Sequence, residues 1–192
     1  VEPAPLMAAL DWFRAFKTPY EVGCLREAGR IAARGHAAVR AGMAEGLSER
    51  QLHAAYLHAT GHLEHETPYT GIIGWDAHGA ILHYSSKASD APDPAHTLLI
   101  DAGASYLGYG SDITRTYVRA GVHPVFAGLL DGMETLQRDL VEAVRPGLPY
   151  SDLHREATRR IGALLADAGV LKAGVDDAVE SVEMVRLPML HI

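Results

Sequence analysis

The sequence predicts an α+β protein in which helices pack on a mainly antiparallel sheet. Segments with helical periodicity lie at both ends of the chain, and short β-rich runs separated by glycine and proline lie between them. With 192 residues, of which 48% are hydrophobic, the chain is long enough to bury the core of one globular domain.

The helices are predicted from their caps and apolar spacing. Thr18, Pro19 and Glu21 provide an N-cap hydroxyl, a proline at the first helical position and the glutamate of a capping box, so a helix is expected over residues 18–42. Ser48 and Gln51 open a second helix that Gly61 should end. Residues 1–17 form a lead-in segment, expected to dock onto another surface, and residues 18–192 form the domain proper.

Beyond Pro68 the pattern changes to strands and then returns to helix. Four short strands are expected at residues 70–75, 80–84, 97–102 and 113–118. Two further helices should cover residues 129–144 and 151–169, the second capped by Ser151 or Asp152. The turns at residues 39–53 and 144–154 resemble each other, which indicates either two ordinary helix pairs or a duplicated unit of helices and strands.

Composition excludes several functional classes. The net charge of −7 argues against a nucleic-acid partner bound through positive charge. The sequence also contains no run of about 18 apolar residues, so no membrane segment is expected. A single cysteine, Cys24, permits no intrachain disulfide, which favours a reducing, cytoplasmic setting.

The densest chemical signal is LLIDAGASYLGYGSDITRTY, residues 98–117. Two β-rich runs flank a turn, and each contributes one carboxylate, Asp101 and Asp112, that a hairpin can bring together. Two facing carboxylates repel each other unless a cation lies between them, and oxygen ligands suit Mn²⁺, Mg²⁺ or Zn²⁺. Taken alone, the two aspartates are a weak signal, and solvated turn carboxylates are the better interpretation.

The longer pattern D-A-G-x-x-x-x-G-Y-x-x-D-x-T-R-T resembles the metal-binding stretch of the creatinase/prolidase (pita-bread) metallopeptidases. Three further matches follow the order of that family: residues 16–21 resemble its K-T-x-x-E opening, Pro68-Tyr69 precedes its first strand, and residues 81–84 resemble its L-H-Y segment. The chain most resembles the bacterial prolidase branch. The resemblance implies a partial pita-bread fold: the first half, plus the helices of the second half.

The resemblance also implies a chemistry, the metal-dependent hydrolysis of Xaa-Pro dipeptides. Members bind two divalent ions, usually manganese and in some cases zinc, through two aspartates, one histidine and two glutamates. By motif, Asp101 and Asp112 are the aspartate ligands and His83 is a catalytic residue lining the site. Thr114 supports a metal ligand without binding the metal itself. Proline-containing peptides are the expected substrates.

The remaining three ligands do not match any residue of this sequence. Met189 and His191 resemble the start of the segment that carries the metal histidine, and the ligand itself would lie four residues after His191. We therefore expect weak or absent metal binding and an inactive, truncated form. The alternatives are a non-catalytic module that binds peptides or proteins, and a peptidase whose site another chain completes.

The other histidines offer a second metal hypothesis. His58 and His62 are spaced at i and i+4 and His65 follows, a pattern that suits Zn²⁺ at a helix end. Gly61 interrupts the helix between them, so surface or packing roles are the alternative.

A partial pita-bread fold is expected to self-associate, because a half without its partner exposes strand edges and apolar helix surfaces. We therefore predict a homodimer, formed through exposed sheet or helix surfaces. Light scattering at micromolar concentration checks this prediction, and a clean monomer would contradict it.

Overall fold

The computed structural model describes residues 3–171, which belong to two compact units, one ending at Tyr117 and the other beginning at Val118. Each unit is described by itself. Met189 and His191 lie outside the described residues. Among the helices that the structure describes, none is long and apolar enough to cross a membrane.

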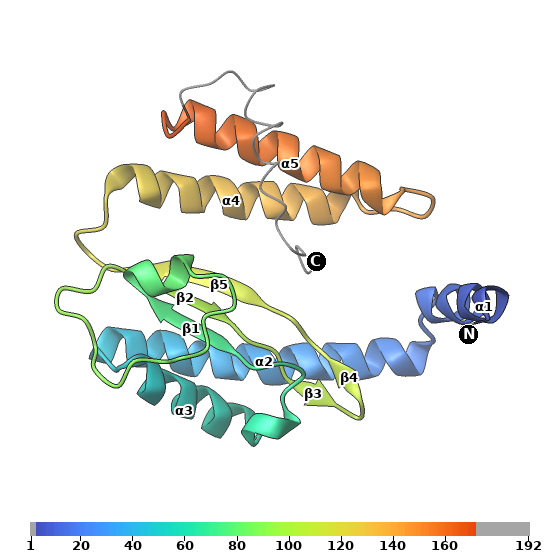
Figure 1. The fold of residues 1–192 in the computed structure, drawn as a ribbon, viewed down its shortest axis with the longest axis horizontal. Coiled ribbons are helices and arrows are strands. Elements are labelled where there is room, and N and C mark those ends of the chain that lie inside the picture. The colour runs from blue at the N-terminus through green and yellow to red at the C-terminus, as the bar shows by residue number, and fades with distance from the viewer. Residues whose placement is uncertain (1–2, 172–192) are drawn as a thin grey trace. The chain divides into compact units, whose positions relative to one another are not determined.

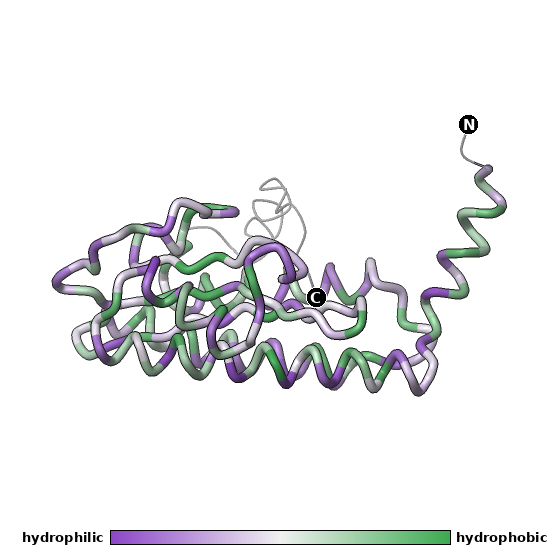
Figure 2. The backbone as a smooth tube through the Cα atoms, turned by 90° about the horizontal axis from the view of Figure 1, so that it is seen from below, coloured by the Kyte–Doolittle hydropathy of each residue, from purple (hydrophilic) through white to green (hydrophobic). Residues whose placement is uncertain are grey.

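The first unit begins with three helices. Helix α1 (Ala4–Ala15) forms within the lead-in segment; none of its residues is buried, and apolar positions follow most of its length (Figure 2). Helices α2 (Pro19–Glu45) and α3 (Glu49–Thr60) each begin with the predicted capping box, and each ends at a left-handed glycine, Gly46 or Gly61. The cap signals therefore located both helices, and α2 continues three residues beyond the expected end.

A three-stranded sheet contacts α2 and α3, in the order β1 (Ile72–Trp75), β2 (Thr97–Asp101) and β5 (Thr114–Val118) (Figure 1). Strands β1 and β2 are antiparallel, with Ile72 opposite Asp101 and Trp75 opposite Leu98. The core joins these helices to the sheet through buried side chains that include Val39, Leu52, Tyr56, Ile73, Leu98 and Ile100. Burial of alternate residues on β2 follows from the two-residue period of a strand.

The chain reverses direction between β2 and β5 through a small hairpin. Its strands, β3 (Ser105–Tyr106) and β4 (Tyr109–Gly110), pair antiparallel. Ser111 fastens the base of this hairpin, because its amide donates to the Ala104 carbonyl at 2.9 Å and its hydroxyl lies 3.0 Å from the Ala104 amide. The hairpin therefore returns the chain to the end of β2.

The strand predicted over residues 80–84 is wrong. Two short 3₁₀ helices, η1 (Glu64–Glu66) and η2 (Asp76–Ala80), flank β1, and a turn follows η2. His83 adopts a left-handed backbone with φ of 55°, and the Tyr84 amide donates to the Ile81 carbonyl at 3.2 Å. A left-handed residue cannot continue a strand, so alternation of apolar residues was misleading here.

The second unit contains two packed helices, α4 (Pro124–Ala143) and α5 (Tyr150–Asp167). Gly132 of α4 faces Leu164 of α5 so closely that an added Cβ would lie 2.4 Å from its methyl carbon. Both helices begin earlier than the sequence predicted, and the N-cap of α5 is Pro149, with no side-chain hydrogen bond, where Ser151 or Asp152 was expected.

Gly103 is the tightest position at the start of the hairpin, because a Cβ there would lie 1.8 Å from the carbonyl oxygen of Ser111. We predict that Gly103→Ala lowers the free energy of unfolding by about 3 kcal/mol, since backbone must move to admit the methyl group. Gly23→Ala is the matched control: Gly23 lies within α2 with no neighbour within 4 Å, so alanine should raise stability by about 0.5 to 1 kcal/mol. Urea unfolding measures both, and equal effects would contradict the assignment.

Candidate metal centre

The two predicted ligands, Asp101 and Asp112, lie together. Asp101 ends β2 and is half-buried, whereas Asp112 follows the hairpin and is exposed. The Ala102 amide donates to the Ile113 carbonyl at 3.1 Å, so the residues after Asp101 and Asp112 are joined directly. The approach of the two carboxylates through a hairpin is thus confirmed.

Tyr69 connects the two carboxylates. Its hydroxyl lies 2.7 Å from Oδ1 of Asp101 and 2.9 Å from Oδ1 of Asp112, within donating distance of both. Burial raises the pKa of the Tyr69 phenol, and the hydrogen bond to Asp101 and the adjacent negative charges raise it further. The phenol therefore remains protonated at neutral pH and holds one proton between two carboxylates.

The position of Tyr69 follows from strand pairing. Ile72 lies opposite Asp101 in the antiparallel pair, so the chain entering β1 passes the end of β2. The sequence pattern placed Tyr69 before the first strand but did not mark it as a site residue. Predicting the role of Tyr69 would have required knowing that β1 pairs with β2.

His36 forms a hydrogen bond with the backbone next to Asp101. It is buried on α2, and its Nε2 lies 3.0 Å from the carbonyl oxygen of Ala102, the residue after Asp101. Burial lowers the pKa of His36 and outweighs the hydrogen bond to Ala102, which raises it; the charges of Arg115 and Asp101 act in opposite directions. A neutral imidazole that donates from Nε2 satisfies this carbonyl without placing a buried charge behind the aspartates.

The other two predicted site residues are both exposed. Thr114 is exposed at the first position of β5, and His83 is exposed in the turn after η2. In the part of the chain that the structure describes, no hydrogen bond joins either side chain to an aspartate. Their roles stay predictions.

A zinc site formed by His58, His62 and His65 receives no support. Both ring nitrogens of His62 contact backbone oxygens, Nδ1 at 3.1 Å from Thr60 and Nε2 at 3.0 Å from Ser105. Within residues 3–171 no three histidine, cysteine or acidic side chains form a group that could hold a metal ion.

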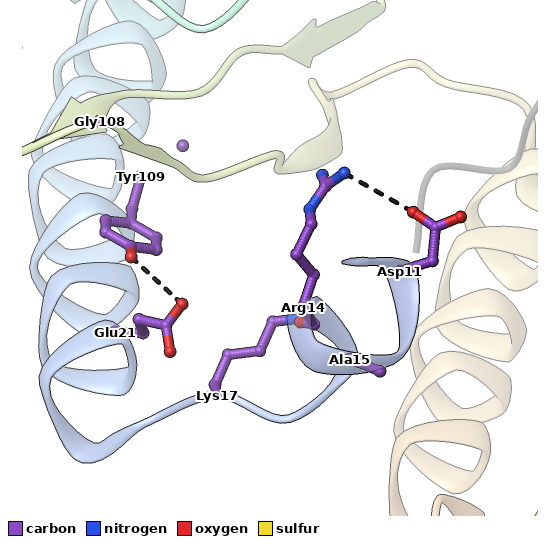
Figure 3. A pocket seen from close by; sticks show the side chains of 8 residues that line it. Asp11, Arg14, Ala15, Lys17, Glu21, Gly108 and Tyr109 are labelled. Carbon is purple, nitrogen blue, oxygen red and sulfur yellow. Dashed lines mark hydrogen bonds and ion pairs between the residues drawn. The ribbon is translucent and has the colours of Figure 1, made fainter. Parts of the chain in front are cut away.

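A separate pocket of about 520 Å³ lies between α1, the start of α2 and the tip of the β3–β4 hairpin (Figure 3). Its polar groups are mostly occupied by one another: Asp11 lies 3.8 Å from Arg14, and the Tyr109 hydroxyl donates to Glu21 at 3.2 Å. Charges of both signs line it, and it shares no lining residue with the aspartate pair.

The aspartate hairpin lies within a long segment that matches a known protein family. Residues 23–179 match the profile of metallopeptidase family M24. The chain belongs to this family. The M24 match implies use of a divalent metal, and two converging carboxylates that share one hydroxyl are a suitable oxygen donor set for such an ion.

Relatives of this M24 chain include Xaa-Pro dipeptidases of other bacteria. It is 45% identical over 189 residues to an Xaa-Pro dipeptidase of Marinobacter nauticus, which covers 98% of this chain and 44% of the relative. It is 41% identical over 179 residues to an Xaa-Pro dipeptidase of Stenotrophomonas maltophilia, with 93% and 40% covered. The chain therefore spans somewhat under half the length of these relatives.

Solved structures show the same architecture. Zinc-substituted E. coli aminopeptidase P in complex with product superposes with a TM-score of 0.76 at 29% identity, covering 89% of this chain and 39% of that one. Proline aminopeptidase P II from Yersinia pestis gives the same TM-score at 31% identity. The expected α+β, partial pita-bread fold is thereby confirmed.

We predict that Tyr69→Phe weakens Mn²⁺ binding by tenfold to a hundredfold, because loss of a group that orients carboxylate ligands typically has this effect. Isothermal titration with MnCl₂ measures it. Tyr106→Phe, at an exposed position of the hairpin, is the control that should bind as the parent does. Tighter binding by Tyr69→Phe would show instead that the hydroxyl only fills the space of the ion.

Proposed function

We propose that this M24 domain takes part in metal-dependent hydrolysis of the peptide bond before proline, with Xaa-Pro dipeptides as substrates. The observation that carries the proposal is the convergence of Asp101 and Asp112 on one hydroxyl, in a chain 41 to 45% identical to Xaa-Pro dipeptidases. When bound, the divalent ion, for which we propose manganese, supplies charge stabilisation and activation of water.

The residues of this chain have distinct parts in the proposal. Asp101 and Asp112 hold the ion, and Tyr69 retains a proton at the carboxylate oxygens that face it. His83, on an exposed turn, contacts the substrate, and Thr114 supports the ligand Asp112. The single cysteine, Cys24, is buried and forms no disulfide, and we propose a cytoplasmic location.

The 192-residue polypeptide tested by itself is proposed to be inactive. Among the described residues, no further histidine or acidic side chain joins Asp101 and Asp112 in a group that could hold a metal ion. Two oxygen side chains hold a divalent ion weakly, because the metal retains water in its other positions. Precise placement of two ions requires ligands that this pair does not provide.

We predict that the polypeptide binds one Mn²⁺ ion weakly and that Asp101→Ala or Asp112→Ala weakens this binding tenfold or more. Isothermal titration, with metal content measured on the same samples, tests it. Asp90→Ala removes an exposed carboxylate from a surface loop and is the matched control with unchanged binding. Equal binding by all variants would contradict the site.

The same samples decide the question of activity. With added Mn²⁺, Xaa-Pro dipeptides should be hydrolysed no faster than with the metal alone. Robust turnover with two bound ions would overturn the proposal that the polypeptide is inactive, and would leave the reaction class intact.

A further inference from the structure

Glu49 is a buried carboxylate that the aspartate pair does not use. It is the first residue of α3, and its exposed fraction is 0%, against 9% for Lys87, the other buried residue among those described that carries a formal charge. A carboxylate this deeply buried is costly unless several donors surround it. Its neighbours therefore indicate what it holds.

Four donors surround Glu49, two at each oxygen. Oε1 accepts from the Trp75 amide at 2.8 Å and lies 2.7 Å from Nδ1 of His78. Oε2 accepts from the Tyr84 hydroxyl at 2.7 Å and the Ala88 amide at 2.6 Å. Burial raises the pKa of Glu49, but the amides of Ala88 and Trp75, with Tyr84 and His78, outweigh this effect and lower it.

These donors lie on both sides of His83. Trp75 and His78 precede the turn at residues 81–84, whereas Tyr84 and Ala88 follow His83. The His78 ring stacks on the Tyr84 ring with centroids 4.6 Å apart, and the Ala88 carbonyl accepts from the Arg50 amide at 3.1 Å. One carboxylate thus fastens both ends of the turn to the first turn of α3.

The segment needs such an anchor because its backbone is irregular. His83 and Lys87 have φ of 55° and 48°, a left-handed backbone conformation that residues other than glycine seldom adopt. Residues in this region persist where surrounding contacts determine them. Glu49 supplies contacts to the residues next to both positions, Tyr84 and Ala88.

We propose that Glu49 is a positioning residue for the turn that presents His83. The inference rests on the proposed function for the role of His83, and on the hydrogen bonds alone for the role of Glu49. Glu49 acts through Tyr84 and Ala88, without touching substrate or metal. Loss of its charge should free the turn while leaving the aspartate pair in place.

Glutamine is a sharp test because it preserves the size of the side chain. Each oxygen of Glu49 accepts one backbone N–H, from Trp75 or from Ala88, so the amide nitrogen of glutamine faces a donor in either orientation. Trp75 is fixed by its pairing with Leu98 in the sheet. The conflict therefore falls on Ala88, and residues 81–88 are released.

Amide exchange measured by NMR on the 192-residue chain tests the proposal. In Glu49→Gln, exchange at the Tyr84 and Ala88 amides should rise at least tenfold, whereas the α2 and β2 amides change less than threefold. Glu142→Gln is the matched control, because Glu142 is an exposed carboxylate on α4. Unchanged exchange at Tyr84 and Ala88, or a uniform rise along the chain, would overturn the proposal.

The ring signal of His83, assigned with His83→Gln, provides a readout that general loss of stability would not select. It should shift or broaden in Glu49→Gln, while the ring signal of buried His36 stays in place. Should circular dichroism show Glu49→Gln to be unfolded, Tyr84→Phe removes one donor with the charge retained and should produce the same local change. A His83 signal unmoved in the folded variants would contradict the proposal.

Mn²⁺ titration separates this inference from the proposed function. Glu49→Gln should bind Mn²⁺ as the parent chain does, because Glu49 does not contact the aspartates. Absence of Mn²⁺ binding in the parent would refute the metal site while the exchange data still decide the role of Glu49. Loss of binding in Glu49→Gln alone would contradict a role confined to the turn.

Discussion

The pairing of β1 with β2 determines the positions of two carboxylate sites: the Asp101–Asp112 pair and Glu49 with its donors. At one end of β1, Ile72 lies opposite Asp101, and the chain just before it delivers Tyr69 to the aspartates. At the other end, Trp75 lies opposite Leu98 and directs its amide to Glu49. A strand of four residues therefore connects the two sites, and a register shift of one residue would move every side chain to the opposite face.

Local signals in the sequence determine the helices near the start of the domain, and tertiary contacts determine the rest. The capping boxes at Thr18 and Ser48 were readable because each satisfies amide groups within one turn. The turn at His83 was misread as a strand, since its left-handed backbone depends on contacts with residues more than thirty positions away. The aspartate pair was predictable because a short hairpin connects its members, and Tyr69 was not, because its contact requires the sheet.

Glu21 and Glu49 show why similar local sequences have different outcomes. Both lie in the first turn of a helix, near a capping hydroxyl, where the helix dipole stabilises a carboxylate. Glu21 bonds mainly within its own turn, to the Thr18 amide at 2.6 Å, and it remains exposed enough to line an open pocket (Figure 3). Glu49 reaches donors across residues 75–88, which no local pattern around Ser48 reveals.

The number of donors distinguishes the two carboxylate sites physically. Glu49 has four donors for one carboxylate, so its charge is satisfied and the site has no capacity for a further cation. Asp101 and Asp112, in the part of the chain that the structure describes, have one hydroxyl between two carboxylates. Their unfilled acceptor positions and combined charge favour a divalent ion, because an uncompensated pair of like charges is unfavourable. Carboxylates thus anchor the turn at one end of β1 and form the proposed ligand pair at the other, and the number of neighbouring hydrogen-bond donors distinguishes the two sites.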